Sequence, residues 1–126
     1  MAPQATHPRF AHAPRRRGED RPTDGAWWPD TRKLEAQLTH LFSLWPRTHS
    51  RISRVQYSPA DWDDQPRMVA VGGGWLVKTE NLLHDDAHRI VLTLADGSRQ
   101  SLEVIAPATS PDVASRRLQY FRSSAA

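Results

Sequence analysis

Two stretches of the chain repeat apolar side chains with the period of an α-helix. The first helix begins at Asp30 or Thr31, either of which could cap it, and should end at Trp45 because a proline follows. Its apolar face consists of Leu34, Leu38, Leu41, Phe42 and Trp45. The second helix is predicted over 111–122, after the N-cap Ser110 and with a proline at its first position. Its apolar side comprises Val113, Ala114, Leu118 and Phe121.

Between these helices, apolar and polar residues alternate with the period of a half-buried β-strand. Five strands are predicted, over residues 52–57, 68–71, 75–79, 90–94 and 100–105. Glycines at 72–74 and Asp96-Gly97 join two pairs of them as hairpins, since glycine supplies the positive φ of such turns. Short turns imply an antiparallel sheet, and both helices should cover one of its faces. We therefore expect an α+β fold in the order helix, five strands, helix.

The N-terminal segment, residues 1–22, differs in composition from the rest of the chain. It contains four of the ten prolines and few large apolar side chains, so it cannot bury enough surface to offset its ordering entropy. We expect a disordered Arg- and Pro-rich tail, followed by one compact domain over residues 23–126. The tail holds five of the 17 basic residues and two of the 14 acidic ones, which leaves the domain with 12 of each and no net charge.

The charge distribution bears on nucleic-acid binding. A neutral domain lacks the concentrated positive field that phosphate binding normally needs. The tail could still make weak contact with nucleic acid through Arg15, Arg16 and Arg17. A nucleic-acid-associated protein is therefore kept as an alternative.

Several function classes are disfavoured by what the sequence lacks. The absence of cysteine excludes disulfides, thiolate catalysis and thiolate metal sites. There is no apolar run of the roughly 18 residues that a membrane span needs, and no secretory signal, so we expect a cytoplasmic protein without a membrane partner. GGGWLVKT at 72–79 imitates a phosphate-binding loop, but Val77 replaces its second glycine and the flanking pattern is strand–turn–strand. The sequence therefore indicates no cofactor.

Acidic residues and histidines gather in two connections of the predicted sheet. ADWDD at 60–64 contains Asp61, Trp62, Asp63 and Asp64, and HDDAH at 84–88 contains His84, Asp85, Asp86 and His88. Such groups could bind a metal or share acid and base roles, but neither spacing is that of a known zinc or calcium site. Aspartates in loops more commonly satisfy turn backbone. The sequence therefore assigns no catalytic or metal-binding residue.

Two adjacent tryptophans, Trp27 and Trp28, lie in DGAWWP at 24–29. Adjacent side chains of an extended segment point to opposite faces, so one indole should pack in the core and the other lie nearer solvent. Tryptophan is enriched at binding hot spots, and loops carry function more often than the scaffold beneath them. The leading hypothesis is a non-enzymatic binding or regulatory module for a protein or small ligand, with a surface formed by Trp27, Trp28, Asp61, Trp62, Asp63, Asp86 and His88. A metal-dependent enzyme built on the Asp and His loops is a further alternative.

A set of motifs occurs in a recognisable order: DGAWWP, Tyr57, Asp61-Trp62-Asp63, Pro66-Arg67, and Asp86-x-His88 before RIVLTLADG. In these motifs the chain resembles a family of small actinobacterial proteins of unknown function, over most of residues 23–118. The resemblance implies a compact bacterial cytoplasmic domain and no established activity, substrate or cofactor. The chain departs from the family pattern at residues 80–83, where the family has glycines and an aromatic residue, and at Ala87, where it has proline.

Overall fold

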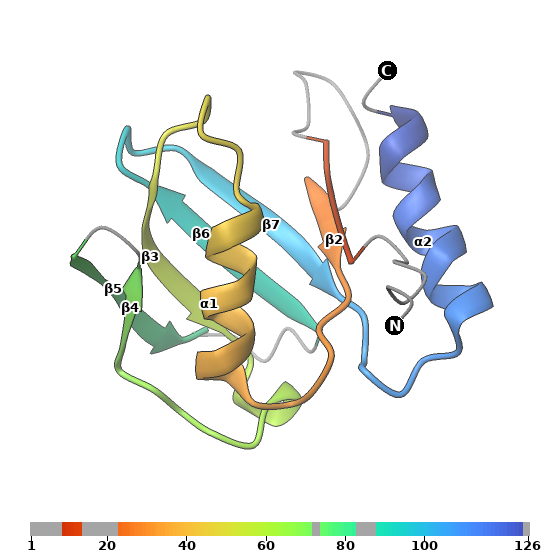
Figure 1. The fold of residues 1–126 in the computed structure, drawn as a ribbon, viewed down its shortest axis with the longest axis horizontal. Helices are drawn as coiled ribbons and strands as arrows, with labels where there is room; N and C mark the ends of the chain where they lie inside the picture. The colour runs from red at the N-terminus through yellow and green to blue at the C-terminus, as the bar shows by residue number, and fades with distance from the viewer. Residues whose placement is uncertain (1–8, 14–22, 72–73, 83–87, 125–126) are drawn as a thin grey trace, which may run out of the picture.

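The computed structural model describes residues 9–13, 23–71, 74–82 and 88–124. These residues form one seven-stranded sheet, two α-helices and a short 3-10 helix. In chain order the elements are β1 (Phe10–His12), β2 (Gly25–Trp27), α1 (Leu34–Leu44), β3 (Ile52–Tyr57), η1 (Pro59–Asp61), β4 (Met68–Val71), β5 (Trp75–Asn81), β6 (Arg89–Leu94), β7 (Arg99–Val104) and α2 (Pro111–Ser124). The strand order is β1-β2-β7-β6-β3-β5-β4; Figure 1 shows α1 lying across the sheet and α2 standing beside β2.

The α+β class is confirmed, but the prediction of five antiparallel strands is wrong. The sheet is mixed, because β2 runs parallel to β7 and β3 runs parallel to β5. The two hairpins, β4–β5 and β6–β7, pair antiparallel as predicted. Although β4 follows β3 in the chain, it lies at the outer edge of the sheet, and β5 lies between β4 and β3. Pairing by sequence neighbours alone therefore assigns the wrong partner to β3.

The strand β1 lies inside the segment that the sequence assigns to a disordered tail. It pairs antiparallel with β2, and the two backbones approach closely at Gly25. A Cβ atom at this position would collide with the carbonyl oxygen of Ala11. The sheet therefore begins before residue 23, whereas residues 1–8 and 14–22, which include Arg15, Arg16 and Arg17, lie outside the described residues.

The helix α1 covers one face of the sheet. It begins at Leu34 and not at Asp30 or Thr31, and the cap comes from a distant residue. The carboxylate of Asp64 accepts hydrogen bonds from the backbone N–H groups of Leu34 and Glu35, which are donors without a partner inside the helix. Beneath the helix lies the main core, which includes Trp27, Leu34, Leu38, Leu41, Val55, Tyr57, Trp62, Ile90, Leu92, Leu102 and Val104.

The helix α2 packs on the opposite face of the sheet, over β1 and β2. A second cluster of buried residues lies there, consisting of Ala11, Ala13, Ala26, Trp28, Ile105, Ala114, Leu118 and Phe121. Ala26 and Trp27 are neighbours in β2 and belong to different clusters, so the two clusters lie on opposite faces. The prediction that both helices cover one face is therefore wrong. The sequence pattern did not reveal β1 and β2. Small side chains of these two strands form the surface on which α2 packs at one end of the sheet.

Candidate functional site

Asp61 and His88, which the sequence places in separate connections, meet at the ends of two central strands of the sheet, β3 and β6. Tyr57 at the end of β3 pairs with Ile90 near the start of β6, so the segments that follow β3 and precede β6 lie side by side. The Asp61 carboxylate accepts two hydrogen bonds from His88. The backbone N–H donates to Oδ2 at 2.8 Å, and the ring Nδ1 lies 2.8 Å from Oδ1. One carboxylate thus holds both the backbone and the ring of the same histidine.

The two partners of this pair differ in their exposure to solvent. The side chain of Asp61 is 7% exposed, whereas that of His88 is 65% exposed. An ionised carboxylate can only accept hydrogen bonds, so a neutral His88 ring carries its proton on Nδ1 and leaves Nε2 as an acceptor. In its neutral form the ring therefore presents an oriented hydrogen-bond acceptor, Nε2, at the protein surface.

The backbone of His88 has a φ of 62°, in the left-handed region that few residues other than glycine adopt. A residue held there generally costs about 1–3 kcal/mol, and such residues occur often at functional sites. Three hydrogen bonds hold His88 in this conformation: the two to Asp61, and one from the backbone N–H of Val104 to the His88 carbonyl oxygen at 2.8 Å. The fold thus imposes the orientation of the ring.

Trp62 and Trp27 lie together behind this pair, in the main core. Their ring centroids are 5.5 Å apart, and their exposed fractions are 5% and 0%. Trp28 faces the other cluster, where it is 4% exposed and the guanidinium of Arg9 lies 4.1 Å from its ring. The two adjacent indoles do point to opposite faces, but the prediction that one lies nearer solvent is wrong, because α2 covers the second face. None of the three tryptophans can serve as an exposed anchor.

The remaining acidic candidates have separate structural partners. Asp63 forms an exposed ion pair with Arg32, with 3.0 Å between Oδ1 and Nε, and Asp64 caps α1. These carboxylates therefore do not form an acid–base pair with Asp61. Asp86 lies outside the described residues, as do His84 and Asp85. Of the predicted surface, the structure brings together Asp61 with His88 and Trp62 with Trp27.

His88 also lines a cavity of about 480 Å³ between α2 and the sheet. The other lining residues are Thr23, Arg89, Glu103, Arg117, Tyr120 and Phe121. Arg89 and Glu103 are cross-strand partners on the face of the sheet opposite α1, and Arg117 of α2 forms an ion pair with Glu103. The described lining of the cavity thus combines Arg89, Arg117, Glu103 and His88 with aromatic residues of α2.

Except for His88, none of the described residues of this cavity was predicted from the sequence as a site residue. Glu103 occupies an outward position of the predicted strand 100–105, and Arg89 directly precedes the predicted strand 90–94, so the alternating pattern could have placed both on the polar face. Only the position of α2 over that face distinguishes them from other outward residues. That position depends on β1 and β2, which the pattern did not reveal.

Neither a metal cluster nor a membrane helix is found in the part of the chain that the structure describes. No group of three or more His, Asp or Glu side chains there is placed to bind a metal ion. Within the same ranges, no helix is long and apolar enough to cross a membrane. The HDDAH segment that motivates the metal-enzyme alternative falls mostly outside these ranges.

Comparison with known proteins identifies a family but no activity. Residues 9–120 match the model of a family of unknown function (DUF5994). The match starts just before β1, so it includes the strand that precedes residue 23. No curated protein and no solved structure shows significant similarity to the chain.

Proposed function

The chain belongs to the family of unknown function DUF5994, and we propose that it is a binding module for a small hydroxycarboxylate. The proposed site is the cavity between α2 and the sheet. One observation carries the proposal: a buried carboxylate, Asp61, orients the exposed ring of His88 at the wall of that cavity. The binding surface is therefore not the tryptophan-rich surface that the sequence suggests.

The charges of the cavity favour an acidic ligand. Among the lining residues that the structure describes, Arg89 and Arg117 supply two positive charges against the negative charge of Glu103, so this part of the lining has a net positive charge. A carboxylate can accept two parallel hydrogen bonds from one guanidinium, and such charge-assisted bonds are about twice as strong as neutral ones. A ligand carboxylate would share or replace the contact between Arg117 and Glu103.

The histidine favours a second group on the same ligand. With its Nδ1 proton directed at Asp61, His88 offers Nε2 as an acceptor, and a ligand hydroxyl is a matching donor. Tyr120 and Phe121 give the cavity an apolar wall against which the carbon skeleton can pack. The volume of about 480 Å³ lies within the usual range for small-molecule sites.

The test uses the full chain labelled with ¹³C in its histidine rings and three probes of one shape. 4-Hydroxybenzoate carries both groups, benzoate lacks the hydroxyl, and 4-hydroxybenzyl alcohol lacks the charge. We expect 4-hydroxybenzoate to shift the His88 ring signal, which is the signal absent from His88→Gln. Benzoate should bind about ten-fold more weakly, since one lost hydrogen bond of about 1.4 kcal/mol corresponds to that factor.

Two variants and a control separate the roles of the groups. His88→Gln should remove most of the preference for 4-hydroxybenzoate over benzoate, and Arg117→Gln should weaken both acids but not the alcohol. His40→Gln is the matched control, because His40 is exposed on α1 and does not line the cavity. The proposal fails if 4-hydroxybenzoate leaves the His88 signal unmoved, or if His88→Gln binds the acids with the preference of the parent chain.

A further inference from the structure

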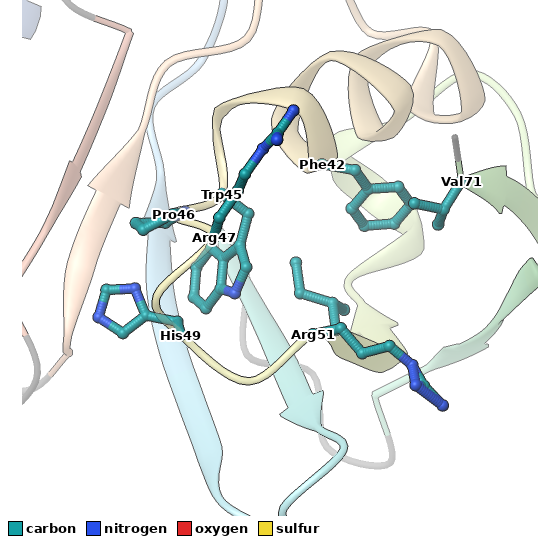
Figure 2. A pocket seen from close by; sticks show the side chains of 8 residues that line it. Phe42, Trp45, Pro46, Arg47, His49, Arg51 and Val71 are labelled. Carbon is teal, nitrogen blue, oxygen red and sulfur yellow. The ribbon is translucent and has the colours of Figure 1, made fainter. Parts of the chain in front are cut away.

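A second cavity, of about 450 Å³, lies between the C-terminal end of α1 and the strands β3 and β4. Its apolar wall consists of Phe42, Trp45, Ile52 and Val71. In Figure 2, Phe42 and Val71 lie together, across from the Trp45 indole. This cavity shares no lining residue with the His88 cavity. It is therefore a separate candidate site with its own chemistry.

The charged residues known to line this cavity are basic. Arg47, His49 and Arg51 come from the segment between α1 and β3, and within the described parts of the chain no aspartate or glutamate lines the cavity. Asp96 lies in the neighbouring β6–β7 turn, where its carboxylate accepts two hydrogen bonds from Ser98. The described lining itself presents two guanidinium groups to an anion.

The aromatic wall is held by the fold itself. The Trp45 indole donates a hydrogen bond from Nε1 to the carbonyl oxygen of Ser50 at 3.0 Å, and the ring centroid of His12 lies 4.7 Å from that of Trp45. The same segment is tied to the sheet, because the backbone N–H of Ala95 donates to the carbonyl oxygen of Arg51 at 2.8 Å. A ligand would not have to order this wall on binding, which lowers the entropic cost of association.

We propose that this cavity binds a small molecule in which a flat apolar body carries a sulfonate, carboxylate or phosphate group. The body would pack against Trp45 and Phe42, and the anionic group would lie against the guanidinium of Arg47 or Arg51. In Figure 2 these two arginines extend on different sides of the apolar wall. Burial of the flat body supplies affinity, and the arginines supply selectivity for the anion.

The test titrates the ¹⁵N-labelled full chain with naphthalene-2-sulfonate and follows the assigned Trp45 indole N–H signal. Two further probes divide the ligand into its parts: 2-naphthol has the ring without the fixed charge, and methanesulfonate has the charge without the ring. We expect naphthalene-2-sulfonate to shift the Trp45 signal at the lowest concentration of the three. It should bind about ten-fold more tightly than 2-naphthol, the factor that a charge-assisted contact of about 1.4 kcal/mol produces.

The double variant Arg47→Gln/Arg51→Gln should bind naphthalene-2-sulfonate about ten-fold more weakly and 2-naphthol unchanged. The matched control is Arg116→Gln/Arg122→Gln, which removes the same charge from exposed positions on α2 and should leave both affinities as in the parent chain. Both double variants change exposed side chains, so folding should be retained. Equal affinity for the two naphthalenes, an unmoved Trp45 signal, or unchanged sulfonate binding by Arg47→Gln/Arg51→Gln would overturn the proposal.

Discussion

Replacement of Asp61 by asparagine should release His88 from its fixed orientation and destabilise the protein. The substitution keeps the size of the side chain but exchanges one acceptor oxygen for an NH₂ group, and both carboxylate oxygens of Asp61 accept hydrogen bonds from His88. One His88 donor therefore loses its charged acceptor, and the ring keeps a hydrogen bond to the new NH₂ group only if it changes its tautomer. Hydrogen bonds to charged groups contribute about 1.5–3 kcal/mol, and we expect a loss of that order because Asp61 is buried.

Urea denaturation of the parent chain and the variant measures this difference in the free energy of unfolding. A second readout reports on the ring itself, since ¹⁵N shifts distinguish the two neutral tautomers of histidine. In the parent chain the proton should reside on Nδ1 of His88, because the Asp61 carboxylate accepts from it. If the new amide in the Asp61→Asn variant turns its NH₂ group toward the ring, the proton moves to Nε2, and the acceptor offered to a ligand hydroxyl is lost.

His88→Gly is the matched control for the stability measurement. Glycine adopts a φ of 62° without steric penalty and keeps the backbone hydrogen bond to Asp61, so only the exposed ring contact is removed. We expect this variant to lose no more than about 1 kcal/mol, clearly less than Asp61→Asn. The reasoning is refuted if Asp61→Asn unfolds within about 0.5 kcal/mol of the parent chain, or if His88→Gly is the more damaging change.

Three further predictions concern the fold. Gly25→Ala should cost about 1–3 kcal/mol in urea denaturation, because the new Cβ collides with the Ala11 carbonyl oxygen; an unchanged midpoint would mean that β1 does not pack as described. Asp64→Ala should cost about 1 kcal/mol, since two backbone N–H groups of the first turn of α1 lose their acceptor, whereas Asp63→Ala, which breaks an exposed ion pair, should cost less than about 0.5 kcal/mol; equal losses would contradict the capping role. Burial lowers the pKa of His12, a shift that its side-chain hydrogen bond opposes in part. The unfolded chain then binds the proton more readily, so the melting temperature should fall as the pH drops below about 6.5, and this fall should be smaller in His12→Gln; identical pH profiles would contradict it.

The parts of the fold that sequence reasoning predicted are those determined by local pattern. The hairpin at Asp96-Gly97 follows from glycine, which adopts a φ of 91° there, and the start of α2 follows from Ser110-Pro111. The strands β1 and β2 are three residues each, too short for a period of two to be recognised. Their place in the sheet depends on pairing with each other and with β7, which lies far along the chain.

The candidate site likewise has parts that the sequence indicated and parts that depend on long-range packing. Composition alone drew attention to Asp61 and His88, because carboxylates and histidines in loops carry chemistry more often than apolar residues do. Their contact spans 27 positions and requires the antiparallel pairing of β3 with β6. Other residues that line the cavity beside His88, such as Arg117, belong to α2, and no local sequence pattern determines the position of this helix. The sequence therefore indicated two chemical groups of the site, but it did not indicate the cavity that they adjoin.

The motif DGAWWP is best understood as the element that joins the two cores. Asp24 pairs with Ser101 of β7 twice: its N–H donates to the carbonyl oxygen at 2.6 Å, and its carboxylate accepts from the N–H at 2.8 Å. Gly25 allows β1 to approach, and the following residues alternate between faces, with Trp27 beneath α1 and Trp28 beneath α2. An exposed indole would have indicated a binding surface. Both indoles are buried instead, because α1 covers Trp27 on one face of the sheet and α2 covers Trp28 on the other face. The motif therefore belongs to the scaffold and lies outside the candidate site, which it supports because Trp27 packs against Trp62, the residue that follows Asp61.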